Sequence, residues 1–234
     1  MSWNQQPSTL TADARDARIT AFLGRVYGWM FLGLLVTTTT AYVVASSPFL
    51  IQTLVLNRVL FWMLMFGQLA LVWFLSAKVQ DMSPATAGLL FMVYSATVGV
   101  TTSVVLLIYT GASLVSTFIV TAGMFGSLAL FGTFTKRSLA GVGQFMFMGL
   151  IGLIIAMVVN IFLASDALGF VISVVGVLVF TGLTAWDAQR MKQMAVALPD
   201  GRVGSFAIVG ALSLYLDFIN LFLFLLRFMG GRRN

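Results

Sequence analysis

Long apolar segments separated by short polar ones make up most of the chain. A helix needs about 20 apolar residues to cross roughly 30 Å of hydrocarbon. Helices also satisfy their own backbone hydrogen bonds, whereas unpaired backbone groups in lipid cost several kcal/mol each. The six longest stretches without Asp, Glu, Lys or Arg are 26–57, 59–77, 82–135, 138–165, 167–186 and 203–216. Since the third stretch is long enough for two crossings, the pattern predicts seven spanning helices, near 26–45, 59–77, 87–109, 113–134, 139–164, 167–186 and 204–227.

The polar segments between these helices are short. Short connections make consecutive helices neighbours, so we expect one compact bundle. The fold class predicted is an all-α polytopic membrane protein. Its parts are a polar N-terminal arm over 1–25, a seven-helix transmembrane domain over 26–228 and a short basic tail over 229–234.

Composition agrees with this class and removes several kinds of chemistry. Of the 234 residues, 60% are hydrophobic and 9% are charged, whereas a soluble domain carries about 25% charged residues. The chain has no cysteine and no histidine, which excludes disulfides, thiol nucleophiles, histidine bases and metal sites built on imidazole or thiolate. We therefore expect neither an enzyme nor a metal centre.

The positive charges indicate topology rather than a nucleic-acid partner. The net charge is +6, but the basic residues lie at helix ends and form no stripe interleaved with aromatic residues. On one side of the seven-helix prediction the loops hold only Arg58. The other side holds nine basic residues, so the N-terminus is expected in the cytoplasm. The nine are Arg15, Arg18, Arg25, Lys78, Lys136, Arg137, Arg190, Lys192 and Arg202.

The basic residues of the C-terminal tail conflict with this assignment. Arg227, Arg232 and Arg233 follow the seventh helix and would face outward. Either the bias of the earlier loops decides the orientation, or the last segment is re-entrant and returns to the cytoplasm. The segment 204–227 is long enough to span, which favours the full crossing.

Asp217 is the residue that breaks the apolar pattern most clearly. It lies inside the last apolar stretch, and a carboxylate at a helix centre costs about 2.5–3.5 kcal/mol on insertion scales. We expect its side chain to face the bundle interior. A stripe of small and polar residues runs along one face of this helix, because its members are spaced three or four residues apart. They are Gly210, Ser213, Asp217 and Asn220.

Asp187 closes the predicted sixth helix, one turn after Thr184 and one turn before Arg190. A surface ion pair with Arg190 is one interpretation. The other is a pair with Asp217, because the two helices are consecutive. Two carboxylates that approach closely in a low-dielectric site cannot both ionise easily, so such a pair would respond to protons. If the last helix begins at Gly204, Asp217 lies about 20 Å from that end of the helix, whereas Asp187 lies near the membrane surface. The two can pair only if the sixth helix extends further inward than predicted or the seventh begins later.

Three segments resemble the Bax inhibitor family, the TMBIM seven-helix membrane proteins, in its bacterial branch. They are LSLYLDFINLFLFLLRF at 212–228, VFTGLTAWDAQRM at 179–191 and STFIVTAGMFGSLALFGTFTKRSLAG at 116–141. The resemblance implies a bundle around a central C-terminal helix in a bacterial inner membrane. It also implies that Asp187 and Asp217 form a pH-sensing pair that gates a calcium leak, with Ca²⁺ as the permeant ion and a membrane-bound protease as a partner.

Some relatives also hold the aspartate pair closed with a basic residue. Lys78 at the end of the second helix and Arg190 near Asp187 are the candidates for this latch. Ser213, Asn220 and Thr184 are the supporting polar residues.

Two other functions compete with a leak channel. Intramembrane aspartyl proteases also carry two aspartates on consecutive late helices, but they use Gly-x-Gly-Asp where this chain has LYLD before Asp217. The stronger alternative is an interaction protein that does not transport but modulates a membrane protease or another membrane partner. The polar residues 1–20, which no spanning helix needs, leave room for such binding.

Overall fold

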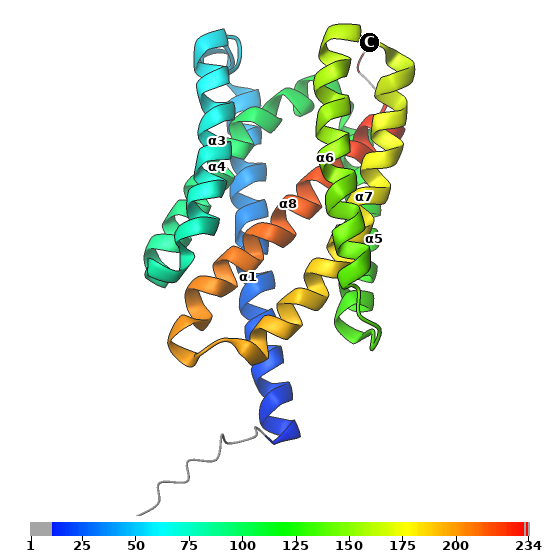
Figure 1. Ribbon diagram of the computed structural model, residues 1–234. Coiled ribbons are helices and arrows are strands. Elements are labelled where there is room, and N and C mark those ends of the chain that lie inside the picture. The colour runs from blue at the N-terminus through cyan, green and yellow to red at the C-terminus, as the bar shows by residue number, and fades with distance from the viewer. Residues whose placement is uncertain (1–10, 232, 234) are drawn as a thin grey trace, which may run out of the picture.

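Seven long helices form a single bundle in the computed structural model, which describes residues 11–231 and 233 (Figure 1). Each of the seven is long and apolar enough to cross a membrane, so the predicted all-α polytopic fold is confirmed. The long helices are α1 (Ala12–Ser46), α3 (Arg58–Lys78), α4 (Pro84–Ile108), α5 (Gly111–Phe134), α6 (Ala140–Leu163), α7 (Asp166–Ala197) and α8 (Val203–Met229). Short helical segments α2 (Pro48–Leu50), η1 (Ile51–Val55), η2 (Val79–Asp81) and η3 (Asp200–Arg202) lie in three connections.

Side-chain caps fix where several of these helices begin. The Ser83 hydroxyl accepts a hydrogen bond from the backbone N–H of Thr86, and Pro84 occupies the first turn of α4. Thr110 caps α5 and Ser165 caps α7 in the same way. A hydroxyl at this position satisfies one of the free N–H groups of a helix start, so the sequence sets these boundaries locally.

Two helices are longer than predicted. α1 begins at Ala12 rather than at 26, so residues 12–25 of the predicted arm are helical. α7 continues to Ala197 rather than stopping at 186. In both cases the added turns bury apolar side chains at helical spacing, and this burial offsets the cost of the polar residues beside them. Residues 1–10 of the arm, and 232 and 234 of the tail, lie outside the described residues.

The last helix is the most enclosed of the seven. In its apolar stretch 61% of the residues are buried, against 6% in both α3 and α6. α8 packs against α1, α4, α5 and α7 and runs obliquely across the bundle (Figure 1). Beyond its end, the carbonyl oxygen of Gly231 accepts a hydrogen bond from the N–H of Thr110, which attaches α8 to the α4–α5 connection.

The start of α1 and the end of α8 lie at opposite ends of the bundle (Figure 1). α1 begins at the end where α3, α5 and α7 finish, and α8 finishes at the other (Figure 1). We call the first of these the N-terminal end of the bundle. An odd number of helices running its full length requires this arrangement.

Candidate functional site

Asp187 and Asp217 lie at similar depths in the bundle. α7 runs to Ala197, so Asp187 lies about 15 Å inside the C-terminal end of its helix. Asp217 lies about 21 Å beyond the first residue of α8. Both lengths are counted from the same connection, 198–202. The extension of α7 beyond its predicted end at 186 therefore places Asp187 inside the bundle, at a depth where it can pair with Asp217.

The structure brings the two carboxyl groups together. Both side chains are buried, with 8% of Asp187 and 5% of Asp217 exposed, and they lie close enough to hydrogen-bond to each other. Oδ1 of Asp187 and Oδ2 of Asp217 are buried without a hydrogen-bond partner among the described residues. Two ionised carboxylates cannot bond to each other, because both only accept. A hydrogen bond between the two groups would therefore require one of them to carry a proton.

Of the two latch candidates, Arg190 is the one that interacts with Asp187. Arg190 follows Asp187 by one turn of α7 and attracts it electrostatically. Its guanidinium group lies over the ring of Trp186, 5.6 Å from the ring centre. Lys78 is exposed at the last residue of α3, and it is not among the described groups that act on either aspartate.

The predicted supporting residues bond mainly to their own helices. The buried hydroxyl of Thr184 donates to the carbonyl oxygen of Phe180 at 2.7 Å. The amide nitrogen of Asn220 donates to the carbonyl oxygen of Leu216 at 2.8 Å. Ser213 is half-buried on α8. None of these bonds reaches a carboxyl group of the pair.

Close helix crossings hold α7 in place beside the pair. A Cβ atom on Gly132 of α5 would collide with the carbonyl oxygen of Ala185, two residues before Asp187. A Cβ atom on Gly210 of α8 would collide with the sulfur of Met191 on α7. Small residues let helix backbones approach closely, so these glycines fix the position of the Asp187 segment against its neighbours.

A buried hydroxyl group connects α8 to α1 near the pair, and sequence reasoning did not identify it. The hydroxyl of Tyr215, two residues before Asp217, lies against that of Thr37. The Tyr215 side chain is completely buried and its ring packs edge-on against the rings of Phe91 and Tyr94. These contacts orient α8 from the α1 and α4 side. The residues are far apart in sequence, so no local pattern signals them.

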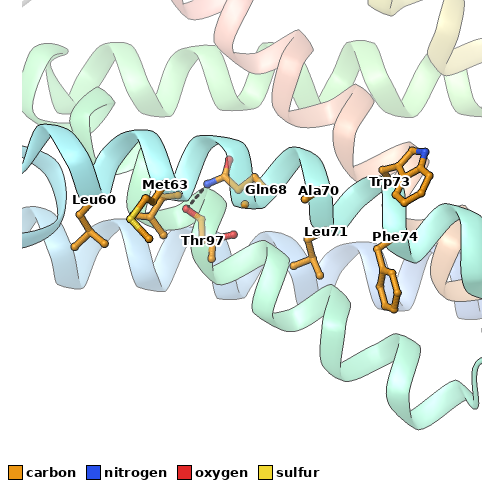
Figure 2. Close-up of a pocket in the computed structure, with 10 residues that line it drawn as sticks. Leu60, Met63, Gln68, Ala70, Leu71, Trp73, Phe74 and Thr97 are labelled. Atoms are coloured by element: carbon orange, nitrogen blue, oxygen red, sulfur yellow. Dashed lines mark hydrogen bonds between the residues drawn. The ribbon is translucent and has the colours of Figure 1, made fainter.

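The largest cavity described lies away from the aspartates, along α3. It has a volume of about 650 Å³ and apolar walls that include Leu60, Met63 and Trp73. Figure 2 shows the Gln68 amide directed at Thr97, whose carbonyl oxygen accepts its hydrogen bond at 2.8 Å. Among the described residues, no three His, Cys, Asp or Glu side chains gather as a metal site. The aspartate pair is therefore the candidate functional site.

Comparisons with known proteins identify the family of the chain and agree with a membrane fold. The family model described as "Inhibitor of apoptosis-promoting Bax1" matches residues 19–234. The inner membrane protein YbhL of Escherichia coli is 47% identical over 93% of this chain and 94% of its own length. A protein of Rickettsia prowazekii is 40% identical over 97% and 98%, and a membrane protein of Streptococcus pyogenes is 35% identical over 92% and 94%. The match extends over nearly the whole bundle and includes both aspartate-bearing helices, so the chain belongs to the Bax inhibitor family.

Proposed function

We propose that this protein is a pH-sensitive calcium leak of the bacterial inner membrane, gated by Asp187 and Asp217. The observation that carries the proposal is the contact between two buried carboxyl groups, each with one oxygen that lacks another partner. The cellular location is inferred from the name of the Escherichia coli relative. The proposal assigns no catalytic role to any residue.

Protonation would control the distance between α7 and α8. With one proton in the pair, a hydrogen bond holds the two carboxyl groups together. Loss of that proton places two like charges side by side in a medium of low dielectric, where their repulsion is strong. The equilibrium then shifts toward a state in which the helices separate or a cation enters.

Arg190 is the better candidate for a latch. It already attracts Asp187, and its guanidinium group also contacts the ring of Trp186 on the same helix. Loss of the proton strengthens the attraction of Arg190 for the pair. Lys78 would have to cross from the end of α3, where it is exposed.

The pair suits the passage of Ca²⁺ better than its storage. Calcium takes six to eight oxygen ligands, whereas two carboxylates supply at most four oxygens. The hydroxyl oxygen of Thr184, one turn before Asp187, would raise this number to at most five. The ion would keep part of its water shell and bind weakly, as conduction requires.

Calcium flux into calcium-free vesicles containing the purified protein tests the proposal. Flux is measured across pH for the wild type, Asp187→Asn and Asp217→Asn. Asparagine keeps the size of aspartate and removes its titration, so each variant should flatten the pH profile. Asp166→Asn is the matched control, because Asp166 is an aspartate in the first turn of α7, at the opposite end from the pair. If both test variants keep the wild-type profile, the aspartates are structural. The alternative then applies, in which the protein modulates a membrane protease or other partner without transport.

Topology is a separate part of the proposal. Nine basic residues lie in the N-terminal part of α1 and near the connections at the N-terminal end of the bundle, so we place that end in the cytoplasm. Reporter fusions at both termini test this placement. Signals from the same compartment at both termini would contradict the seventh crossing.

A further inference from the structure

A basic pocket opens at the N-terminal end of the bundle. It has a volume of about 460 Å³ and lies between α1, the α5–α6 connection and the last turns of α7. No acidic side chain is among the described residues that line it. Four cationic side chains line it from three separate segments, and they are Arg15, Lys136, Arg137 and Lys192.

A buried glutamine holds one wall of this pocket. Gln189 is only 7% exposed. Its amide nitrogen donates to the carbonyl oxygen of Arg137 at 2.8 Å, and its amide oxygen accepts from the N–H of Leu139 at 2.8 Å. Both ends of the amide are therefore bonded to the backbone of the α5–α6 connection. This fixes the segment that carries Lys136 and Arg137 before any ligand arrives.

The cations of the pocket retain unused hydrogen-bond donors. Lys192 donates to the carbonyl oxygen of Thr133 at 2.8 Å, which uses one of its three donors. Lys136 and Arg137 are exposed, and the bonds to Gln189 use only backbone atoms of their connection. A phosphate group accepts several such bonds and favours convergent cations.

Exposed apolar side chains lie near the end of α5 and the start of α6, on either side of the connection that lines the pocket. Phe134, which directly precedes the pocket residue Thr135, is 74% exposed. Val142 and Phe145, in the first turns of α6, are 42% and 70% exposed. A ligand that joins a phosphate to hydrocarbon chains would match both regions at once, whereas a free phosphate would use only the first.

We propose that this pocket binds the headgroup of an anionic phospholipid, with its acyl chains lying over Phe134 and Phe145. Basic pockets between helices at the membrane surface are a recurring form of lipid headgroup site. Each cation near the surface contributes about fivefold to the affinity for anionic lipid. The site is independent of the aspartate pair and of its proposed gating.

Lipid retention by the purified full-length protein tests this site. Native mass spectrometry follows retention from micelles that contain equal amounts of phosphatidylglycerol and phosphatidylcholine. We expect the wild type to prefer phosphatidylglycerol. The double variant Lys136→Gln/Arg137→Gln should lower that preference by about tenfold to thirtyfold. Lys78→Gln is the matched control, because Lys78 is exposed at the same end of the bundle but outside the pocket.

Three results would overturn the proposal. The first is equal retention of the two lipids by the wild type. The second is an equal loss in Lys78→Gln, which would indicate diffuse surface charge. The third is displacement of phosphatidylglycerol by millimolar inorganic phosphate, which would identify a free-anion site. If the double variant does not fold, Arg15→Gln tests the pocket from α1 with an expected loss of about fivefold.

Discussion

The hydroxyl oxygen of Tyr215 lies 2.6 Å from Oγ1 of Thr37, inside the bundle between α8 and α1. Oγ1 of Thr37 is also 2.9 Å from the carbonyl oxygens of Gly33 and Ser95. A carbonyl oxygen only accepts hydrogen bonds. When Thr37 donates its single proton to one of them, Tyr215 donates to Thr37. Donation to Ser95 extends the chain of bonds from α8 through α1 to α4, whereas donation to Gly33 stays within α1.

Removing the Thr37 hydroxyl should therefore destabilise the bundle. We expect Thr37→Val to lower the free energy of unfolding by about 1–2 kcal/mol, because the buried Tyr215 hydroxyl loses this partner. Thermal unfolding in detergent measures the change. Thr39→Val, at an exposed position of the same helix, should have little effect. An equal loss in both variants would show that the hydroxyl contact adds nothing to stability.

The α5–α7 crossing gives a second prediction. Gly132→Ala places a methyl group against the backbone carbonyl of Ala185, which cannot move without shifting α7. The variant should lose about 1–3 kcal/mol of unfolding free energy. Gly126→Ala is the control, because its new methyl group meets nothing within 4 Å. It should be neutral or up to about 1 kcal/mol more stable. A stable Gly132→Ala protein would mean that the crossing can widen freely.

The bonds made by Gln189 predict the susceptibility of the α5–α6 connection to trypsin. Lys136 and Arg137 are exposed cleavage sites, but the connection must open before a protease can bind it. Gln189→Met removes both hydrogen bonds of the side-chain amide, so trypsin should cleave the α5–α6 connection at least about tenfold faster. Gln193→Met changes an exposed glutamine one turn further along α7 and should cleave at the wild-type rate. Equal rates in all three proteins would show that Gln189 does not restrain the connection.

The aspartate pair should behave as one unit in the calcium-flux assay. If Asp187 and Asp217 share a proton, removing either titrating group already abolishes the shared proton. The double variant Asp187→Asn/Asp217→Asn should therefore have the same flat pH profile as each single variant, a non-additive result. Flux at each pH in vesicles measures this. Effects that add would mean that the two carboxyl groups titrate separately.

The number and place of the helices could be predicted because the bilayer imposes a strict rule on charge. The predicted spans coincide with the observed helices to within a few residues, except at the start of α1 and the end of α7. The same rule predicted that Asp217 turns inward, and the residue is buried. These features depend on single segments, so the sequence of each segment was sufficient.

The end of α7 was misjudged for a physical reason. Residues 187–197 contain Asp187, Arg190 and Lys192, and charge in such a stretch suggests a loop. Ala188, Met191 and Ala195 nevertheless lie three or four residues apart and are all buried. The segment is an amphipathic helix at the end of the bundle, and its periodicity was the signal that could have extended the prediction.

The contacts that join distant segments could not be predicted. Gln189 bonds to the backbone of Arg137 across 52 positions, and Thr37 meets Tyr215 across 178. Each residue is ordinary within its own helix. Only the packing of the whole bundle selects their partners, so the basic pocket and the buried hydroxyl chain required the structure.

The enclosure of α8 also has a consequence for how the protein is made. A ribosome synthesises α8 after the four helices that it packs against, so these enter the membrane before the segment that fills the space among them exists. Throughout that interval Asp187 has no second carboxyl group beside it. Closure of the bundle around α8, and with it the contact between the two aspartates, therefore comes after the other helices have been synthesised. The bond between Thr110 and Gly231 can form only when translation has passed the last helix.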